Sequence, residues 1–168
     1  MTEISNTIIA DSLREKFGEK ILSISEPFGL LTITIHKDDN IEVIGFLVNN
    51  PAYEFTFLTD LCGIHYPEQE GMELGVIYHL HSLRHNIRIR IKTYVAADLP
   101  VLNSLTSLFQ SANWMERETY DFYGIRFEGH PNLKRILNMD EMDYFPLQKQ
   151  YPLEDGKRED KEDLYFGR

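Results

Sequence analysis

Two alternating segments around a short turn constrain the fold of this chain more than any other feature of its sequence. Residues 72–82 read MELGVIYHLHS and residues 87–94 read IRIRIKTY, with LRHN between them. Strict alternation of apolar and polar residues is typical of a β-strand with one buried face. The segments therefore predict a β-hairpin whose apolar face is formed by Met72, Leu74, Val76, Tyr78 and Leu80 on the first strand and Ile87, Ile89, Ile91 and Thr93 on the second.

The turn predicts which residues of this hairpin lie opposite each other. Pairing Leu83 with Asn86 places Leu80 opposite Ile89, so the apolar residues of both strands share one side of the sheet. The polar side of the hairpin then carries His79, His81, Arg88, Arg90 and Lys92.

This polar side has three possible interpretations. Two histidines at alternate strand positions share a face and could bind a metal ion, with His85 close by in the sequence, but the neighbouring arginines would repel a cation. The bases could bind phosphates, although the net charge of −10 opposes nucleic acid. We therefore expect neither a metal site nor nucleic-acid binding here. Contact with an acidic protein surface, or with the chain's own acids, is the favoured interpretation.

The remaining periodicities predict the other elements. Apolar residues recur at helical spacing over 4–17, and Gly18 follows as a stop signal. Further patterns predict strands over 21–25, 30–36 and 55–66, a helix over 41–48 behind the candidate caps Asp38, Asp39 and Asn40, and helices over 101–110 and 112–123. The order α-β-β-α-β-β-β, followed by helix, predicts an α+β domain with a mixed sheet covered by helices on one face.

The C-terminal segment differs in composition from the rest of the chain. Residues 138–168 hold nine acids and five bases, and their few apolar residues follow no period. Pro146 and Pro152 would interrupt a helix. We therefore divide the chain into a domain at 1–137 and an extended tail at 138–168, which is either disordered or docked on another surface.

Composition excludes several classes of function. The single Cys62 allows no internal disulfide and no iron–sulfur cluster held by this chain alone, and we expect it to be a small buried residue. The glycine motifs of nucleotide-binding loops are absent. No apolar run reaches the ~20 residues of a membrane span, and the N-terminus has no signal-peptide pattern. We expect a soluble, intracellular protein with no cofactor of its own.

A dense cluster of charged and aromatic residues lies between residues 116 and 137, which read ERETYDFYGIRFEGHPNLKRIL. On a helix, Trp114, Arg117, Glu118 and Asp121 fall within one sector, and Arg117 and Asp121 have the spacing of an ion pair. The remaining acids, Glu116 and Glu118, would need cations from the following loop, where the candidates are Arg126, Lys134 and Arg135.

This cluster has a structural and a catalytic interpretation. A network of charges that fixes the helix to the following loop explains it without further chemistry, and Pro131 would stiffen that loop by restricting His130. General acid or base chemistry by Glu118 or Asp121 is the alternative, but neither a nucleophile nor a cofactor motif accompanies them. We favour the structural interpretation and expect no catalytic residue.

The same residues resemble a family signature. The pattern E-R-E-x-Y-D-x-[FY]-G-I-x-F-x-G-H-P-x-L-[RK]-R-I-L is similar to that of the C-type, or 30-kDa, subunit family of respiratory complex I. Residues 145–153, FPLQKQYPL, resemble a second family motif, although Gln148 and Gln150 replace its usual Arg and Asp. The resemblance implies a structural or interface motif formed by Trp114, Glu116, Arg117, Glu118, Tyr120, Asp121, Gly124, His130, Pro131, Lys134, Arg135, Pro146, Leu147 and Lys149.

The resemblance also implies a function and partners. Members of this family are non-redox subunits of the hydrophilic arm of NADH:quinone oxidoreductase (complex I), an enzyme that passes electrons from NADH to quinone and pumps protons. The expected partners are the large 49-kDa-type (D-type) subunit, the small cluster-bearing B-type subunit and other hydrophilic-arm subunits, with FMN and iron–sulfur clusters in partner subunits. The implied location is peripheral, on the cytoplasmic side of the bacterial inner membrane.

Two alternatives stay open at this point. The first is the equivalent subunit of a membrane-bound hydrogenase or formate hydrogenlyase, which shares this module. The second is a free-standing domain that binds acidic ligands through the basic side of the sheet.

Overall fold

The computed structural model describes residues 4–152 and has an α+β architecture, as predicted. The main helices are α1 (Asn6–Phe17), α2 (Asn40–Asn49) and α3 (Ala112–Tyr123). Short 3₁₀ turns lie at Gly18–Lys20, Pro27–Gly29 and Lys37–Asp39. The strands are β1 (Ile21–Ser25), β2 (Leu31–Ile35), β3 (Phe57–His65), β4 (Leu74–Ser82), β5 (Ile87–Val95), β6 (Val101–Asn103) and β7 (Arg126–Glu128).

The central sheet is mixed and has the strand order β1-β2-β5-β4-β3. β2 and β5 run parallel, and the other neighbours run antiparallel. The predicted hairpin register is confirmed, because Leu80 lies opposite Ile89 and Tyr78 lies opposite Ile91. All four side chains are fully buried, as the alternation of the sequence requires.

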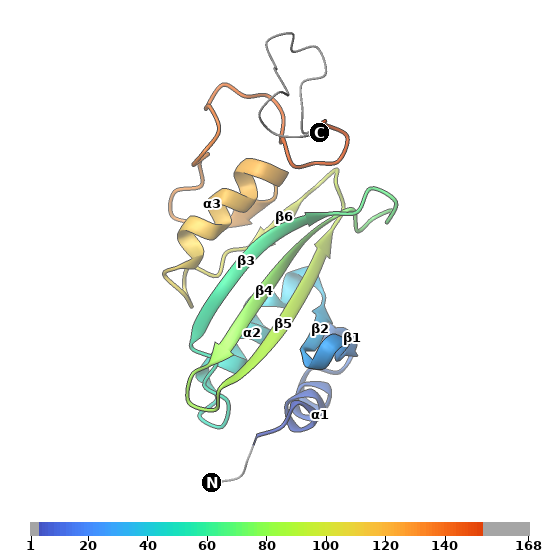
Figure 1. The fold of residues 1–168 in the computed structure, drawn as a ribbon, viewed down its shortest axis with the longest axis vertical. Helices are drawn as coiled ribbons and strands as arrows, with labels where there is room; N and C mark the ends of the chain where they lie inside the picture. Colours follow the sequence, from blue (N-terminus) through green and yellow to red (C-terminus); the bar gives the residue numbers. More distant parts are fainter. Residues whose placement is uncertain (1–3, 153–168) are drawn as a thin grey trace, which may run out of the picture.

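One face of the sheet carries the core. In Figure 1, α1 and α2 lie behind the strands, and α3 lies beside β3 at the other end of the sheet. Ile9 and Leu13 of α1 and Ile44 and Leu47 of α2 are buried in the same cluster as Ile33 of β2. The apolar stripes of α1 and α2 thus cover the apolar side of the sheet, and no helix covers the polar side of β4 and β5.

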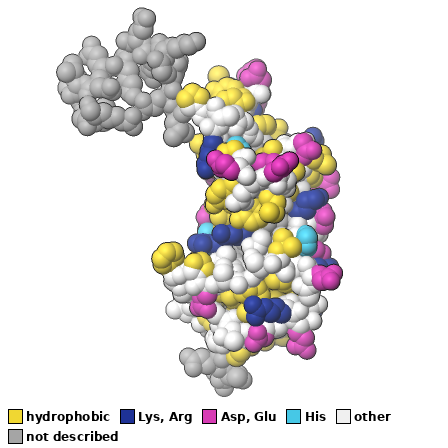
Figure 2. All heavy atoms as spheres, turned by 90° about the vertical axis from the view of Figure 1, so that its right-hand side faces the viewer, with side chains coloured by type: hydrophobic (Ala, Val, Ile, Leu, Met, Phe, Trp, Pro, Cys, Tyr) yellow, Lys and Arg dark blue, Asp and Glu magenta, His cyan; other side chains and the backbone are white. Residues whose placement is uncertain are grey.

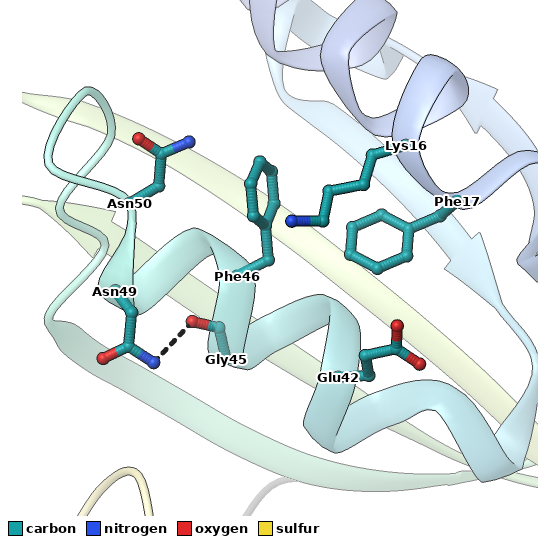
Figure 3. Close-up of a pocket in the computed structure, with 7 residues that line it drawn as sticks. All are labelled: Lys16, Phe17, Glu42, Gly45, Phe46, Asn49 and Asn50. Carbon is teal, nitrogen blue, oxygen red and sulfur yellow. Dashed lines mark hydrogen bonds between the residues drawn. The ribbon is translucent and has the colours of Figure 1, made fainter.

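Local signals explain where the first helix begins and ends. The Ser5 hydroxyl accepts a hydrogen bond from the N–H of Ile8 at 3.3 Å, and Gly18 ends the helix with φ 48°. Where α1 meets α2, the rings of Phe17 and Phe46 pack edge to face, and the Lys16 ammonium lies 4.1 Å from the centre of the Phe46 ring. Figure 3 shows these side chains around the shallow pocket between the two helices.

The segment after Pro100 departs from the prediction. The apolar spacing predicts a helix over 101–110, but Val101–Asn103 form β6, which pairs in parallel with β7. Leu102 and Phe127 are both buried in this small sheet. The apolar residues of this segment do have helical spacing. Strand formation, however, depends on pairing with a partner that is distant in the sequence, and no local pattern indicates that partner. Of the three candidate caps, Asp39 is the N-cap residue of α2, without a side-chain cap hydrogen bond. Asn40 is buried inside the first turn, where its amide donates to the Asn103 carbonyl at 2.7 Å.

The described part of the tail, residues 138–152, lies against the domain rather than away from it. The N–H of Leu147 donates to the Phe122 carbonyl at 3.1 Å, and the N–H of Lys149 donates to Nδ1 of His65 at 2.9 Å. Residues 153–168 lie outside the described residues, so the docking of the tail on a partner stays a prediction. Among the described residues, no helix has the length and apolarity that crossing a bilayer requires.

Candidate functional site

Asp121 is the centre of the charged motif. Its side chain is fully buried on α3, and Oδ1 accepts a hydrogen bond from Nη1 of Arg135 at 2.8 Å. Oδ2 accepts the N–H groups of three successive residues, Ile136 at 3.1 Å, Leu137 at 2.8 Å and Asn138 at 2.9 Å. We call Asp121, Arg135 and these three N–H groups the Asp121 cluster. It closes the loop after β7 onto the helix.

The pKa of Asp121 follows from this arrangement. Burial alone would raise it, but the N–H groups of residues 136–138 and the Arg135 guanidinium outweigh burial and hold the pKa of this carboxyl well below its usual range. Asp121 therefore stays ionised at any physiological pH. An ionised carboxylate with four donors around it is a fixed anchor and a poor proton acceptor.

Arg135 extends the cluster into the tail. Its Nη2 donates to the carbonyls of Met142 at 2.7 Å and Tyr144 at 2.9 Å, and its guanidinium carbon lies 5.0 Å from the centre of the Phe145 ring. One planar guanidinium thus connects α3 with residues 142–145, because its five donors point in several fixed directions.

The predicted ion pair between Arg117 and Asp121 is wrong. Arg117 instead donates to the carbonyls of Lys134 at 3.1 Å and Arg135 at 2.9 Å, and its guanidinium lies 5.1 Å from the Trp114 ring. The loop brings three N–H donors to Asp121 and turns two carbonyls toward Arg117, so each side chain satisfies backbone groups that would otherwise be buried without partners.

Glu116 also departs from the prediction, because none of the ion pairs formed among residues 4–152 includes it. Its side chain is fully buried on the side of α3 that faces β6, where Oε2 accepts the Ser104 hydroxyl at 2.7 Å and Oε1 accepts the Leu105 N–H at 2.7 Å. Burial raises the pKa of Glu116 to about 7, and these two hydrogen bonds offset the effect in part. Glu118, in contrast, is exposed and takes no part in the network of hydrogen bonds formed among the described residues.

Gly124 allows the chain to turn out of α3. It has φ 81° and donates its N–H to the Tyr120 carbonyl at 2.9 Å. A Cβ at this position would lie 2.6 Å from the Phe145 ring, and that ring also contacts Tyr120 edge to face. The glycine is thus required both by the turn and by the close approach of the tail.

The second motif covers the C-terminal end of α3. Pro146 is half-buried, Leu147 hydrogen bonds to the helix as described above, and the Gln148 amide donates to the Tyr123 carbonyl at 2.7 Å. The Lys149 ammonium lies 5.4 Å from the Tyr66 ring. Gln148, a departure from the family pattern, therefore satisfies a terminal helix carbonyl without any charge.

His130 and Pro131 shape the loop between β7 and the Asp121 cluster. The His130 Nδ1 accepts the Asn132 N–H at 3.0 Å, so the neutral ring carries its proton on Nε2 and donates it to the Asn113 carbonyl at 3.0 Å. Pro131 and Lys134 are exposed. The histidine therefore connects the loop to the first turn of α3.

The structure brings most of the predicted motif residues together. Ser104 and His65 contribute from outside both motifs, and Gln148 contributes from a position of the second motif that is not among the predicted site residues; the sequence spacing indicates none of the three. Cys62 is half-buried in a cavity of about 150 Å³ beside Gly63 and Glu118 rather than within the core, and burial raises the pKa of its thiol. Among residues 4–152, no group of three or more His, Cys, Asp or Glu side chains is placed to hold a metal ion.

A family model described as the 30-kDa subunit of respiratory-chain NADH dehydrogenase matches residues 33–157, which include both motifs. This chain belongs to that family. The C-type subunit of NADH-quinone oxidoreductase from Methylobacterium radiotolerans is 41% identical over 145 residues, covering 86% of this chain and 66% of the relative. A C-type subunit of the same enzyme from Rhizobium etli is 40% identical over 142 residues, covering 84% and 74%. The chain therefore spans about two thirds to three quarters of the length of these relatives.

Two solved structures have a similar fold. A trypsin-resistant fragment of Nqo5 is 31% identical and superimposes with a TM-score of 0.63 over 74% of this chain and 98% of that fragment. A chain of an archaeal membrane-bound sulfane sulfur reductase, 17% identical, superimposes with a TM-score of 0.69 over 86% of this chain and 84% of its own length. The second similarity concerns the fold alone.

Proposed function

We propose that this chain is a non-redox structural subunit of the hydrophilic arm of an NADH:quinone oxidoreductase. In this role it contacts the large 49-kDa-type subunit, the small cluster-bearing B-type subunit and other subunits of the arm. It supports electron transfer from NADH to quinone, coupled to proton translocation, without taking part in the chemistry. The proposed location is peripheral, on the cytoplasmic side of the bacterial inner membrane.

The observation that most directly supports this proposal is that the charged side chains of the motif bind backbone groups of the motif itself. Asp121 binds three N–H groups and Arg135, and Arg117 binds two carbonyls of the same loop. A general base needs a pKa near the working pH and access to substrate, and the buried, strongly acidic Asp121 has neither. The motif therefore supports a fixed shape rather than a reaction.

That fixed shape presents an apolar surface to a neighbour. Beside the Asp121 cluster, Trp114 is 62% exposed, Leu137 69% and Met139 70%. Large apolar side chains at such exposure are typical of interaction surfaces, and aromatic residues are frequent at the centres of interfaces. We propose that these three residues contact a partner subunit of the assembled enzyme.

The proposal also assigns the cofactors to other chains. A single cysteine cannot hold an iron–sulfur cluster, which takes about four such ligands, and the sequence lacks nucleotide-binding glycine motifs. FMN and the clusters belong to partner subunits in this account. The hydrogenase alternative differs in its electron donor and its partners, and the naming of the similar relatives as NADH-quinone oxidoreductase subunits favours the first proposal.

Purification from native membranes tests the proposal. A tagged chain, extracted in mild detergent, is expected to bring with it subunits that carry FMN and iron–sulfur clusters and to show NADH:quinone activity. The same chain purified alone is expected to be colourless. Recovery of the chain without partners, or a flavin or cluster absorption band in the isolated chain, contradicts the proposal.

A further inference from the structure

The polar face of the sheet carries a row of cations that belongs to no feature described so far. On β5, Arg88, Arg90 and Lys92 occupy alternate positions and point away from the core, because the intervening Ile89 and Ile91 are fully buried. Alternate residues of a strand are ~6.6–6.8 Å apart. The three cations therefore form a straight row, which we call the β5 row.

Hydroxyl groups line one side of this row. On β2, Thr34 lies beside Lys92 and is half-buried, whereas Thr32, beside Arg90, is buried and donates its hydroxyl to the Leu30 carbonyl at 3.1 Å. On β1, the next strand outward, Ser25 and Ser23 lie beside these two threonines. Hydroxyls both donate and accept hydrogen bonds, so this strip suits a polar chain laid along the sheet.

The other side of the row is nearly without acids. On β4, His81 lies beside Arg88 and His79 lies beside Arg90. Nε2 of His79 accepts Nε of Arg90 at 3.0 Å, and Nδ1 lies 3.5 Å from the Asp60 carboxylate. Burial and Arg90 lower the pKa of His79, so the ring is neutral at pH 7 and the charge of Arg90 persists.

The cations of the β5 row have no carboxylate partner within the described chain. None of the ion pairs formed among residues 4–152 includes Arg88, Arg90 or Lys92. In Figure 1 no helix covers this face over β4 and β5, where Arg88 is exposed and Arg90 and Lys92 are half-buried. Within the described residues, the β5 row is therefore a local surplus of positive charge on a chain whose net charge is −10.

We infer that the β5 row is a docking surface for an acidic, extended segment of another protein. Carboxylates at alternate positions of an extended chain have the spacing of the row, and the hydroxyl strip beside it suits the backbone and short polar side chains of such a segment. This goes beyond the proposed function, because it defines a second surface, on the face of the sheet that α1 and α2 leave uncovered, and the chemistry of its occupant.

The charge of the whole molecule favours a protein segment over nucleic acid or an anionic membrane. Nucleic acid and anionic membranes both present extended negative surfaces. Such a surface would reach beyond the few cations of the row and be repelled by the rest of a chain whose net charge is −10. Figure 2 shows acidic, basic and apolar side chains interspersed over the side of the molecule that carries β1 and β2, with no broad basic surface on that side. A short acidic segment contacts only the cations of the row, and salt screens its repulsion by the more distant acids of the chain.

Peptide binding to the purified full chain tests the inference. The probe is a fluorescent peptide of about eight residues with Glu and Thr in alternation, long enough to follow β5. Fluorescence anisotropy is expected to show binding that weakens as salt rises from about 50 to about 200 mM. The matched Gln and Thr peptide is expected not to bind.

Charge-matched variants locate the site. The variant R88A/R90A/K92A is expected to weaken binding on the order of tenfold, which corresponds to three exposed ion pairs. The control R14A/K37A/R126A removes the same charge from exposed positions elsewhere and is expected to leave binding within about twofold. Arg88→Ala alone, at an exposed position, is expected to weaken binding about two- to threefold and guards against misfolding of the triple variant.

Several results overturn the inference. These are absence of peptide binding, equal losses in the two triple variants, and tighter binding of a single-stranded oligonucleotide or of phosphatidylglycerol vesicles than of the acidic peptide. Because the purified chain is used, these results are independent of whether the chain assembles with the subunits of the proposed enzyme.

Discussion

Replacing Asp121 with Asn is expected to destabilise the chain strongly, although the side chain keeps its size. The amide has one oxygen, so its NH₂ group must face either the three N–H donors of residues 136–138 or the Arg135 guanidinium. Either orientation removes the charge from a fully buried pair and leaves donors without an acceptor. Breaking a buried pair in this way costs ~3–5 kcal/mol, and we expect the lower end because Arg135 retains its carbonyl partners.

Urea denaturation of the isolated chain measures this loss. With a denaturant slope of about 2 kcal/mol/M, a loss of ~3 kcal/mol lowers the unfolding midpoint by about 1.5 M. Glu118→Gln is the matched control on the same helix, because Glu118 is exposed. It is expected to cost no more than ~0.5 kcal/mol, which lowers the midpoint by at most ~0.25 M. An unchanged midpoint for Asp121→Asn would refute the argument that Asp121 holds the loop.

The remaining predictions concern the sheet, the buried acid and the helix end. Ile89→Asp is expected to lower the stability of the fold by several kcal/mol, because it buries an unpaired charge, whereas Arg90→Asp on the polar face is expected to cost under ~1 kcal/mol. Thermal melts compare the two variants, and equal losses of stability would mean that the faces are reversed. Burial raises the pKa of Glu116 to about 7, above its ordinary 4.5, so this group favours the folded state most below pH ~4.5 and that contribution, roughly 3 kcal/mol, is lost as pH rises through 7. Glu116→Gln should remove this slope from urea midpoints measured between pH 5 and 8, and a slope identical to wild type counts against the assignment. Gly124→Ala is expected to lower the stability of the fold by ~2 kcal/mol or more and Gly129→Ala by about 1 kcal/mol. Both glycines have φ 81°, but a Cβ at residue 124 would also contact the Phe145 ring. Equal melting temperatures of the two variants would argue against this close approach.

The hairpin shows how much the sequence alone can decide. Its register follows from alternation and a four-residue turn, because a shift of one residue would turn Leu80 and Ile89 to solvent. The C-terminal ends of helices are similarly accessible where a local signal exists, as at Gly18 and Gly124.

The pairing of β6 with β7 and the partners of Asp121 are not predictable in the same way. Short strands such as Val101–Asn103 gain their identity from a partner distant in the chain, here Arg126–Glu128. The residue spacing suggests a side-chain pair within α3, but three backbone N–H groups and Arg135 compete more strongly for Asp121. Residue spacing indicates which side chains can contact each other. It does not indicate which backbone N–H groups will compete for a side chain, because every residue other than proline carries one.

The most direct test of the central claim is the NADH:quinone turnover per assembled complex in cells that carry Asp121→Ala. Native gels give the amount of complex, and activity divided by that amount gives the turnover. If the motif is structural, the amount of complex falls and the turnover of each assembled complex stays at the wild-type value. A normal amount of complex with a large loss of turnover would show that Asp121 takes part in the chemistry and would contradict the account.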